Sequence, residues 1–213
     1  MPTPYDRDEK YLHPLLRQLL PNLLQVMKQN LPVGITAKAI SMHRTPTDQF
    51  ELFKQGRKFS NGRWAIVERS KVVTFKDGFV SLSRHNYLPG TAFDTGLFQG
   101  SDYLEESPHY KVIGIAAHQL NLDWGGDWSG FVDKPHIEIP LTRFFQGSIQ
   151  KDVARQWQKY LRRAGTYTKA LDGIFGPAST DALEAETGQR ERNIKTWELL
   201  FNKFGPVENL LDA

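Results

Sequence analysis

The hydrophobic positions near the N-terminus follow the period of a helix. Apolar residues recur there at helical spacing and so fall on one face. They are Leu15, Leu16, Leu19, Leu20, Leu23, Leu24 and Met27. Pro21 lies inside this stripe, where it either kinks the helix or opens a second one. Because Pro14, Arg17 and Lys28 also interrupt this stretch, it predicts an amphipathic helix of the core scaffold and no membrane span.

The next part of the chain mixes strand and helix patterns. Small and β-branched residues at 34–44 predict a strand that leads into a helix at Thr45, where Thr45 can be the N-cap and Asp48 its capping-box partner. Further patterns predict short strands at 64–67 and 71–75, a helix within 110–122 and a strand at 136–140. Together they predict an α+β domain that ends near Phe145.

A second, helical region follows. Residues 146–148, Gln-Gly-Ser, form the expected joint, because a new helical stripe starts at once. That stripe consists of Ile149, Val153, Trp157, Tyr160 and Leu161. A turn at 172–177 and two further helices complete a compact three-helix module. We therefore divide the chain into a domain of residues 1–146 and a helical domain of residues 147–213.

The composition limits the possible chemistry. The chain has 213 residues, no cysteine and a net charge of +3. Without cysteine it has no disulfide, thiolate nucleophile or Cys-ligated zinc, so a metal site must use His, Asp and Glu. The small, dispersed charge does not predict nucleic-acid binding. Residues 1–10 are polar and charged, so no secretory signal peptide is predicted.

One helix has a locally basic face that could meet an anionic polymer or could simply be solvated. Its cationic residues are Lys151, Arg155, Lys159, Arg162 and Arg163.

Three residues form the best candidate metal site. Zinc hydrolases use three protein ligands and an open position for water, and two imidazoles with one carboxylate leave the metal positively charged. His85, Asp94 and His136 offer this set. Their spacing alone is uninformative, because the chain has no H-E-x-x-H helix, and any one histidine taken alone is more often a structural residue.

Four short features occur in an order typical of one hydrolase family. They are Arg44-Thr45-Pro46 with Gln49, Ser83 with His85, Ala92 with Asp94, and Asp133 with His136. This order resembles the M15 peptidases, the family of D-Ala-D-Ala peptidases and L-alanyl-D-glutamate endopeptidases found in phage endolysins. The resemblance extends over most of residues 35–140. It implies a D-Ala-D-Ala peptidase/Hedgehog-like fold, with a small antiparallel sheet and flanking helices.

The resemblance also implies a role for each matching residue. His85, Asp94 and His136 would hold Zn²⁺, Asp133 would be the general base and proton shuttle, and Arg44 would lie near the scissile carbonyl. The interval from His85 to Asp94 is longer by two residues than in the commonest form of the family motif. Asp133 stands where the dipeptidase branch has Glu, which favours the endopeptidase branch.

Further residues are candidate substrate contacts. The sequence Trp124-Gly125-Gly126-Asp127-Trp128 resembles a loop that precedes the last histidine in the family, and its aromatic residues could line a substrate groove or pack in the core. The resulting set of candidate substrate-binding residues is Gln49, Ser83, Trp124, Asp127 and Trp128.

The helical module resembles the three-helix peptidoglycan-binding domain. The resemblance is carried by the turn Asp172-Gly173-Ile174-Phe175-Gly176-Pro177 before the module's second helix. Gly173 and Gly176 permit a positive φ there, and Pro177 can open the helix at its first position. Wall binding by this module is what the resemblance implies, since a turn motif is itself mainly structural.

These features predict a zinc metallopeptidase that hydrolyses the L-Ala to D-Glu bond of peptidoglycan stem peptides. The absence of a signal peptide suggests a phage endolysin, a monomer that waits in the host cytoplasm until lysis and then acts on the cell wall or in the periplasm. No nucleic-acid or membrane partner is predicted. A D-Ala-D-Ala carboxypeptidase or cross-link endopeptidase on the same fold remains an alternative. A non-catalytic wall-binding or virion protein is the alternative from another class.

Overall fold

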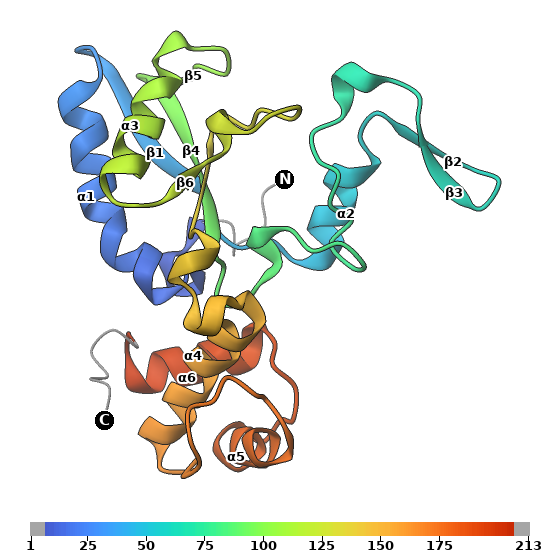
Figure 1. The fold of residues 1–213 in the computed structure, drawn as a ribbon, viewed down its shortest axis with the longest axis vertical. Helices are drawn as coiled ribbons and strands as arrows, with labels where there is room; N and C mark the ends of the chain where they lie inside the picture. The colour runs from blue at the N-terminus through green and yellow to red at the C-terminus, as the bar shows by residue number, and fades with distance from the viewer. Residues whose placement is uncertain (1–6, 207–213) are drawn as a thin grey trace.

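The computed structural model describes residues 7–206. Two parts of the chain lie outside the described residues. They are residues 1–6, within the stretch where no signal peptide is predicted, and residues 207–213, at the end of the predicted helical domain. None of the described helices combines the length and the apolar character needed to cross a membrane. Figure 1 shows a sheet with helices on one side, a projecting segment on the other and a group of three helices below them.

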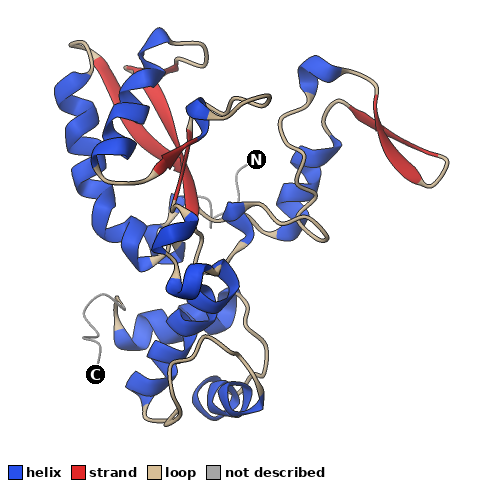
Figure 2. Ribbon diagram, viewed as in Figure 1, coloured by secondary structure: helices blue, strands red, loops and turns tan. Residues whose placement is uncertain are grey.

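A small antiparallel sheet positions the site. Its path is β1-β4-β7-β6, with β5 paired to β4, and Figure 2 shows its strands in red. The strands are β1 (Ile35–Ser41), β4 (Ala92–Gln99), β5 (Asp102–Tyr103), β6 (Asp123–Trp124) and β7 (His136–Glu138). Helices α1 (Pro14–Asn30) and α3 (Lys111–Gln119) pack together and bury the apolar side of the sheet. The predicted α+β fold class, with a small antiparallel sheet and flanking helices, is confirmed.

Helix α1 has the predicted apolar face. Leu16, Leu20, Leu23 and Met27 are buried on it, in the same core as Phe93 of β4. The helix continues through Pro21, so no second helix opens there.

Residues 46–82 form an arm that projects on the side of the sheet away from α1 and α3 (Figure 1). It contains α2 (Pro46–Lys54) and the hairpin of β2 (Arg57–Ser60) and β3 (Arg63–Ile66). Thr45 caps α2 as predicted, because its hydroxyl accepts a hydrogen bond from the Asp48 N–H at 3.2 Å. Asp48 is not the expected capping-box partner, since its carboxylate accepts from the Thr45 hydroxyl.

The predicted strand at 71–75 is wrong. Residues Arg69–Lys71 form a short 3-10 helix, and the chain that follows is irregular. Its backbone carbonyls accept hydrogen bonds from side chains and not from a neighbouring strand. The Arg57 guanidinium donates to the Thr74 carbonyl at 2.8 Å, and the Gln49 amide donates to the Lys76 carbonyl at 3.0 Å. The β-branched residues here therefore line a loop.

The short 3-10 helices connect the larger elements. They are η2 (Glu9–Tyr11), η3 (Arg69–Lys71), η4 (Arg84–Asn86), η5 (Pro108–Tyr110), η6 (Gly125–Asp127), η7 (Leu141–Arg143) and η8 (Phe145–Gly147).

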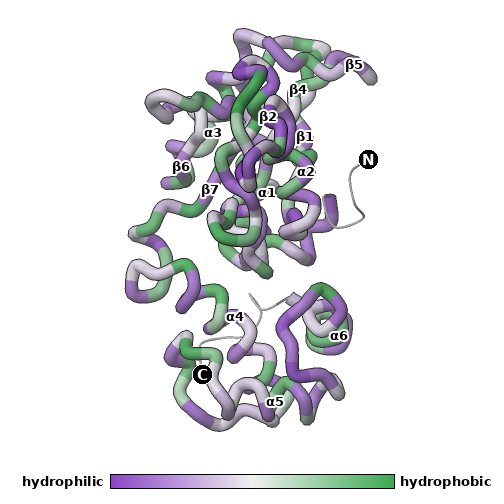
Figure 3. Tube along the Cα trace, turned by 90° about the vertical axis from the view of Figure 1, so that its right-hand side faces the viewer, coloured by the Kyte–Doolittle hydropathy of each residue, from purple (hydrophilic) through white to green (hydrophobic). Residues whose placement is uncertain are grey.

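Helices α4 (Ile149–Ala164), α5 (Pro177–Thr187) and α6 (Ile194–Phe204) form a helical unit with its own core. Figure 3, turned by 90°, again places these three helices below the rest of the chain. The buried residues of this core are Tyr11, Val153, Trp157, Tyr160, Leu161, Tyr167, Ala182, Leu183, Trp197 and Leu200.

The turn before α5 partly follows the prediction. Pro177 is the first residue of α5, and Gly173 has a φ of +73° with no room for a side chain, because an added Cβ would lie 2.4 Å from the Lys151 carbonyl oxygen. The expectation of a positive φ at Gly176 is wrong, since its φ is −97° and it serves as the extended N-cap residue of α5.

A buried hydrogen bond between a histidine and an aspartate joins the helical unit to the N-terminal segment. His13 Nε2 lies 2.8 Å from Asp152 Oδ1, and both side chains are less than a tenth exposed. The other Asp152 oxygen accepts the backbone N–H of Phe145 at 2.6 Å, and the Gln156 amide donates to Oδ1 at 2.8 Å. Burial opposes ionisation of Asp152, but these hydrogen bonds, led by that of His13, lower its pKa.

Replacing Asp152 by alanine is expected to lower the free energy of unfolding by about 2–5 kcal/mol, because it leaves His13 Nε2 and the Phe145 N–H without their acceptor. In the wild type, a carboxylate with a lowered folded-state pKa stabilises the fold above the ordinary aspartate pKa, near 4. That contribution is lost as the pH falls through the folded-state pKa. Urea unfolding at several pH values measures both effects. If the free energy of unfolding fell with acid in the variant as it does in the wild type, Asp152 would not be the group responsible.

Candidate metal centre

Two strands and one short helix bring the candidate ligands together. Asp94 on β4 and His136 on β7 are direct partners across the antiparallel pair. His85 comes from η4, which Ser83 and Asn86 hold in a capping box. Residues separated by 51 positions in the sequence thus meet at one end of the sheet.

The three side chains converge through one atom each. His85 Nε2 lies 3.3 Å from Asp94 Oδ1 and 3.3 Å from His136 Nδ1, and His136 Nδ1 lies 3.2 Å from the same Asp94 oxygen. Ligands about 2.0–2.1 Å from a tetrahedral zinc are separated by roughly 3.3–3.4 Å, so the triangle has the dimensions of a zinc site. The two histidines are buried, which keeps the donor atoms close to a single point.

The electrostatics of this triad favour a cation. Burial alone would lower the pKa of His136, but hydrogen bonds to Asp94 and Glu138 raise it to about 9. Burial lowers the pKa of His85, so His85 is neutral, whereas His136 holds a proton that a metal ion would have to displace. The pKa of Asp94 is held well below its ordinary value, because the two histidines outweigh the effect of burial. The donor set therefore fits a divalent metal ion.

Arg44 lies beside the triad. Its Nη2 is 3.4 Å from Asp94 Oδ2 and donates to the Ser41 hydroxyl at 3.0 Å, while Nη1 donates to Gln49 Oε1 at 2.8 Å. Gln49 is fully buried, and its amide donates to Thr74 and Lys76 of the arm. Gln49 was a candidate substrate contact, but the structure places it behind Arg44, where it orients the guanidinium.

Asp133 has the pKa of a proton-transfer group. Burial and the negative charge of Asp94 raise the pKa of Asp133 to about 6, against the opposing effects of His136 and Arg44. The backbone holds this residue on both sides, since its N–H donates to the Gly125 carbonyl at 2.9 Å and its carbonyl accepts from the His136 N–H at 3.2 Å. Asp133 is therefore fixed relative to the triad and can change protonation near neutral pH.

A cavity of about 790 Å³ opens over the triad. One wall comes from the arm, with residues 73–76, and the other carries Trp128 and Phe131. The two walls touch where Phe75 packs edge-on against Phe131, with ring centroids 5.4 Å apart. The floor holds the triad together with Arg44 and Asp133. A peptide could lie between these walls with its backbone over the triad.

The remaining candidate contacts divide between cavity and scaffold. Ser83 lines the cavity and caps η4, and the Trp128 ring lies 4.9 Å from that of His136 in the same cavity. Trp124 instead packs on Gly114 of α3 and donates its indole N–H to the Lys134 carbonyl at 2.7 Å. Asp127 pairs with His118 on the exposed side of the loop. Of the W-G-G-D-W residues, the structure thus brings Trp128 to the site.

Histidine 43, beside Arg44 in the sequence, is structural. It is buried, it bonds the Tyr87 carbonyl at 3.1 Å through Nδ1, and burial lowers its pKa to about 4.

Sequence reasoning missed one carboxylate at the site. Glu138 Oε2 lies 3.0 Å from His136 Nε2, the ring nitrogen that faces away from the triad, and Glu138 Oε1 accepts from Arg84 at 3.0 Å. A carboxylate on the outer nitrogen fixes the orientation and tautomer of a metal-binding imidazole. The available signal was its position two residues after His136 on a strand, which places both side chains on one face.

Replacing Glu138 by glutamine is expected to weaken metal binding by about 10- to 100-fold, because the His136 ring loses its charged acceptor. Competition with a chromogenic chelator measures this affinity. Glu106→Gln is the matched control, since Glu106 pairs with Lys134 on the surface with its side chain 83% exposed. Equal affinities for Glu138→Gln and the wild type would show that the contact does not act on the metal.

Comparisons with known proteins agree with this geometry. A family model of the M15 peptidase type, described as D-alanyl-D-alanine carboxypeptidase, matches residues 78–139. The chain is also 32% identical over 156 residues to the peptidoglycan L-alanyl-D-glutamate endopeptidase CwlK of Bacillus subtilis (strain 168), covering 65% of this chain and 77% of that protein.

The chain belongs to the M15 peptidase family. This M15 peptidase is also 24% identical over 129 residues to the L-alanyl-D-glutamate peptidase of Listeria phage A118, covering 59% of this chain and 45% of the phage protein. A solved structure, the L-Ala D-Glu endopeptidase ChiX of Serratia marcescens, matches 63% of this chain and 84% of its own with 20% identity and a TM-score of 0.38. The predicted family and the predicted peptidase activity are confirmed.

M15 peptidases are metallopeptidases, and the triad of this M15 peptidase is a cluster that can bind a metal. The family match covers the segment that contains all three candidate ligands and Asp133.

Proposed function

We propose that this chain is a zinc-dependent endopeptidase that hydrolyses the L-Ala to D-Glu bond of peptidoglycan stem peptides. The observation that carries the proposal is the convergence of His85, Asp94 and His136 on the floor of the cavity, with Asp133 and Arg44 beside them. The relatives named for this bond, in Bacillus subtilis and in a Listeria phage, support the choice of substrate.

Zinc is the metal that fits this donor set best. Two imidazole nitrogens and one carboxylate oxygen, with a further position open to the cavity, are typical ligands of catalytic zinc. When bound, the ion supplies a Lewis acid that acidifies water and polarises a carbonyl group. His85, Asp94 and His136 would hold it, and Glu138 would orient the His136 ring.

Two other residues of the floor would act on the substrate. The Asp133 carboxylate would accept a proton from the attacking water and pass it to the amine of the leaving D-Glu residue, as its pKa near 6 allows. The Arg44 guanidinium, held by Gln49 and Ser41, would face the negative charge that develops on the scissile carbonyl oxygen. Trp128 and Ser83 would contact the stem peptide from the cavity wall.

The helical unit would bind the cell wall. Its turn before α5 resembles that of peptidoglycan-binding domains, and the cationic residues of α4 could meet wall carboxylates. Holding a second site on the same polymer would raise the local substrate concentration. The protein would act as a monomeric phage endolysin, kept in the host cytoplasm until lysis and then active on the wall.

A D-Ala-D-Ala carboxypeptidase is the second candidate, because the matching family model has that description. The two activities leave different chain ends. Purified protein would be incubated with insoluble peptidoglycan, and the new termini identified by mass spectrometry. New N-terminal D-Glu supports the proposed endopeptidase, and released D-Ala supports the carboxypeptidase. Wall binding without any cleavage would contradict both.

A further inference from the structure

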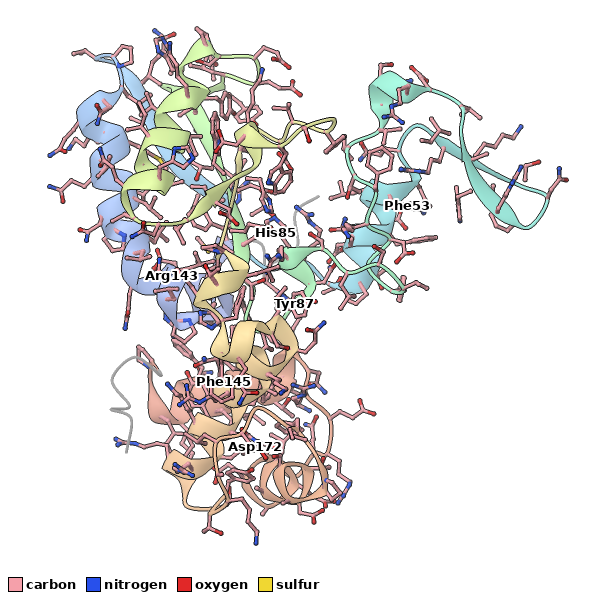
Figure 4. All side chains as sticks on the ribbon, in the orientation of Figure 1. Phe53, His85, Tyr87, Arg143, Phe145 and Asp172 are labelled. Carbon is pink, nitrogen blue, oxygen red and sulfur yellow. The ribbon has the colours of Figure 1, made fainter. Side chains whose placement is uncertain are left out.

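The turn between two of the metal-binding residues touches the helical unit. The chain runs from His85 through a turn at residues 87–90 to Asp94. Figure 4 shows Tyr87 between His85 and Phe145 of η8, with Asp172 of the helical unit further along in the same direction. Tyr87 and Leu88 pack against the core of the helical unit.

One hydrogen bond joins the turn directly to α4. The indole N–H of Trp157 donates to the Leu88 carbonyl at 2.7 Å, across 69 positions of sequence. Trp157 is fully buried, and its ring packs against Trp197 at a centroid distance of 5.0 Å. Because the indole N–H of the buried Trp157 is costly to leave without an acceptor, this bond helps to define the position of the turn.

The helical unit also holds the turn through the N-terminal segment. The Gly90 N–H donates to the Tyr11 carbonyl at 2.7 Å, and the Gly90 carbonyl accepts from the His13 N–H at 2.8 Å. Tyr11 belongs to the core of the helical unit and donates its hydroxyl to Glu198 of α6. His13 pairs with Asp152 of α4. Both contacts of Gly90 are therefore made by residues that α4 and α6 hold.

His85 depends on this support more than the other two ligands do. Asp94 and His136 lie on paired strands, and Glu138 orients the His136 ring. The outer nitrogen of His85, Nδ1, is buried and has no hydrogen-bond partner within residues 7–206. The His85 ring is therefore placed by its backbone and its packing. That backbone is fixed by the capping box of η4, by the Arg44 N–H, which donates to the His85 carbonyl at 2.9 Å, and by the turn that follows.

We infer that the helical unit positions the His85 ligand through Trp157 and the turn 87–90, and so sets the metal affinity of the site. Trp157 is a positioning residue in this inference, which rests on the metal site of the proposed function. If the turn loosens, only a fraction of the molecules hold His85 in the position that binds zinc. The apparent dissociation constant for zinc then equals its intrinsic value divided by that fraction. The unit is thus part of the peptidase site in addition to any role at the wall.

The test is the Trp157→Phe substitution in the full chain, which keeps an aromatic ring and removes the indole N–H. We expect zinc affinity, measured by chelator competition, to fall by about 5- to 10-fold, the effect of losing one buried hydrogen bond. The visible spectrum of the cobalt-substituted variant should change as well, because it reports ligand geometry. At saturating zinc, the variant should regain most of the peptidase activity that it loses at limiting zinc.

Tyr160→Phe is the matched control. Tyr160 lies on the same helix and is buried in the same core, but its hydroxyl donates to the Gly205 carbonyl at the end of α6. This variant should lose stability and keep the zinc affinity of the wild type. Unchanged zinc affinity in Trp157→Phe, or an equal loss in both variants, would overturn the inference. Failure of the wild type itself to bind zinc would instead refute the proposed metal site.

A measurement on the wild type covers the case in which Trp157→Phe does not fold. Coupling between two sites is reciprocal, so zinc should slow hydrogen exchange of the Trp157 indole N–H. Exchange that is the same with and without zinc would overturn the inference.

Discussion

Asp133→Asn is expected to lower kcat by about 10²- to 10⁴-fold while the protein keeps its metal, because the amide has the shape of the carboxylate but cannot carry a proton between water and the leaving amine. The position of Asp133 in the cavity and its pKa, raised to about 6 by burial and by Asp94, are the basis for this size of effect. Turnover of a stem-peptide substrate and the metal content of the purified variant are the two measurements.

Asp102→Asn is the control, because it makes the same chemical change at a residue of β5 that is exposed on the surface. It should retain wild-type turnover. If Asp133→Asn retained more than a tenth of the wild-type kcat, another group would have to move the proton. If Asp133→Asn lost its metal, its low activity would say nothing about proton transfer. The expectation that this variant keeps its metal would then be wrong.

The second large effect concerns the metal itself. His85→Ala is expected to weaken zinc binding by at least roughly 10²-fold, since four-ligand sites bind with about 10–16 kcal/mol, or about 3 kcal/mol for each ligand. Activity at micromolar zinc should then disappear, and chelation should abolish the activity of the wild type in the same way. Isothermal titration with zinc measures the binding, and chain-end analysis of treated peptidoglycan measures the activity.

His118→Ala separates this effect from the general loss of a histidine. His118 also pairs with an aspartate, Asp127, at 2.6 Å, but its side chain is 54% exposed and lies outside the triad. Its removal should leave zinc affinity and activity unchanged. Zinc binding by His85→Ala with wild-type affinity would exclude His85 as a ligand.

The sequence indicated the parts of the site that short motifs define. His85, Asp94 and His136 come from segments with their own local signals, and the antiparallel pairing of β4 with β7 explains why Asp94 and His136 meet. Arg44 and its neighbour Thr45 stand where a strand ends and a capped helix begins, which the pattern also predicted.

What the sequence did not reveal depends on packing between distant segments. Gln49 matched a motif, but only the fold shows that it is buried behind Arg44. Trp124 and Trp128 are equivalent in the sequence, yet one packs on α3 and the other lines the cavity. The Trp157 contact with Leu88 has no local signal at all, because its two partners are joined only by the docking of the helical unit.

The shared core around Tyr11 limits how this protein can be recombined. A lysin made of independent parts can exchange its C-terminal part at the joint between the two. Here the joint near residue 147 does not separate them, because Tyr11 is buried among the C-terminal helices and Trp157 bonds the turn beside His85. A functional chimera would therefore have to carry residues 9–13 and 87–90 from the same parent as α4 and α6.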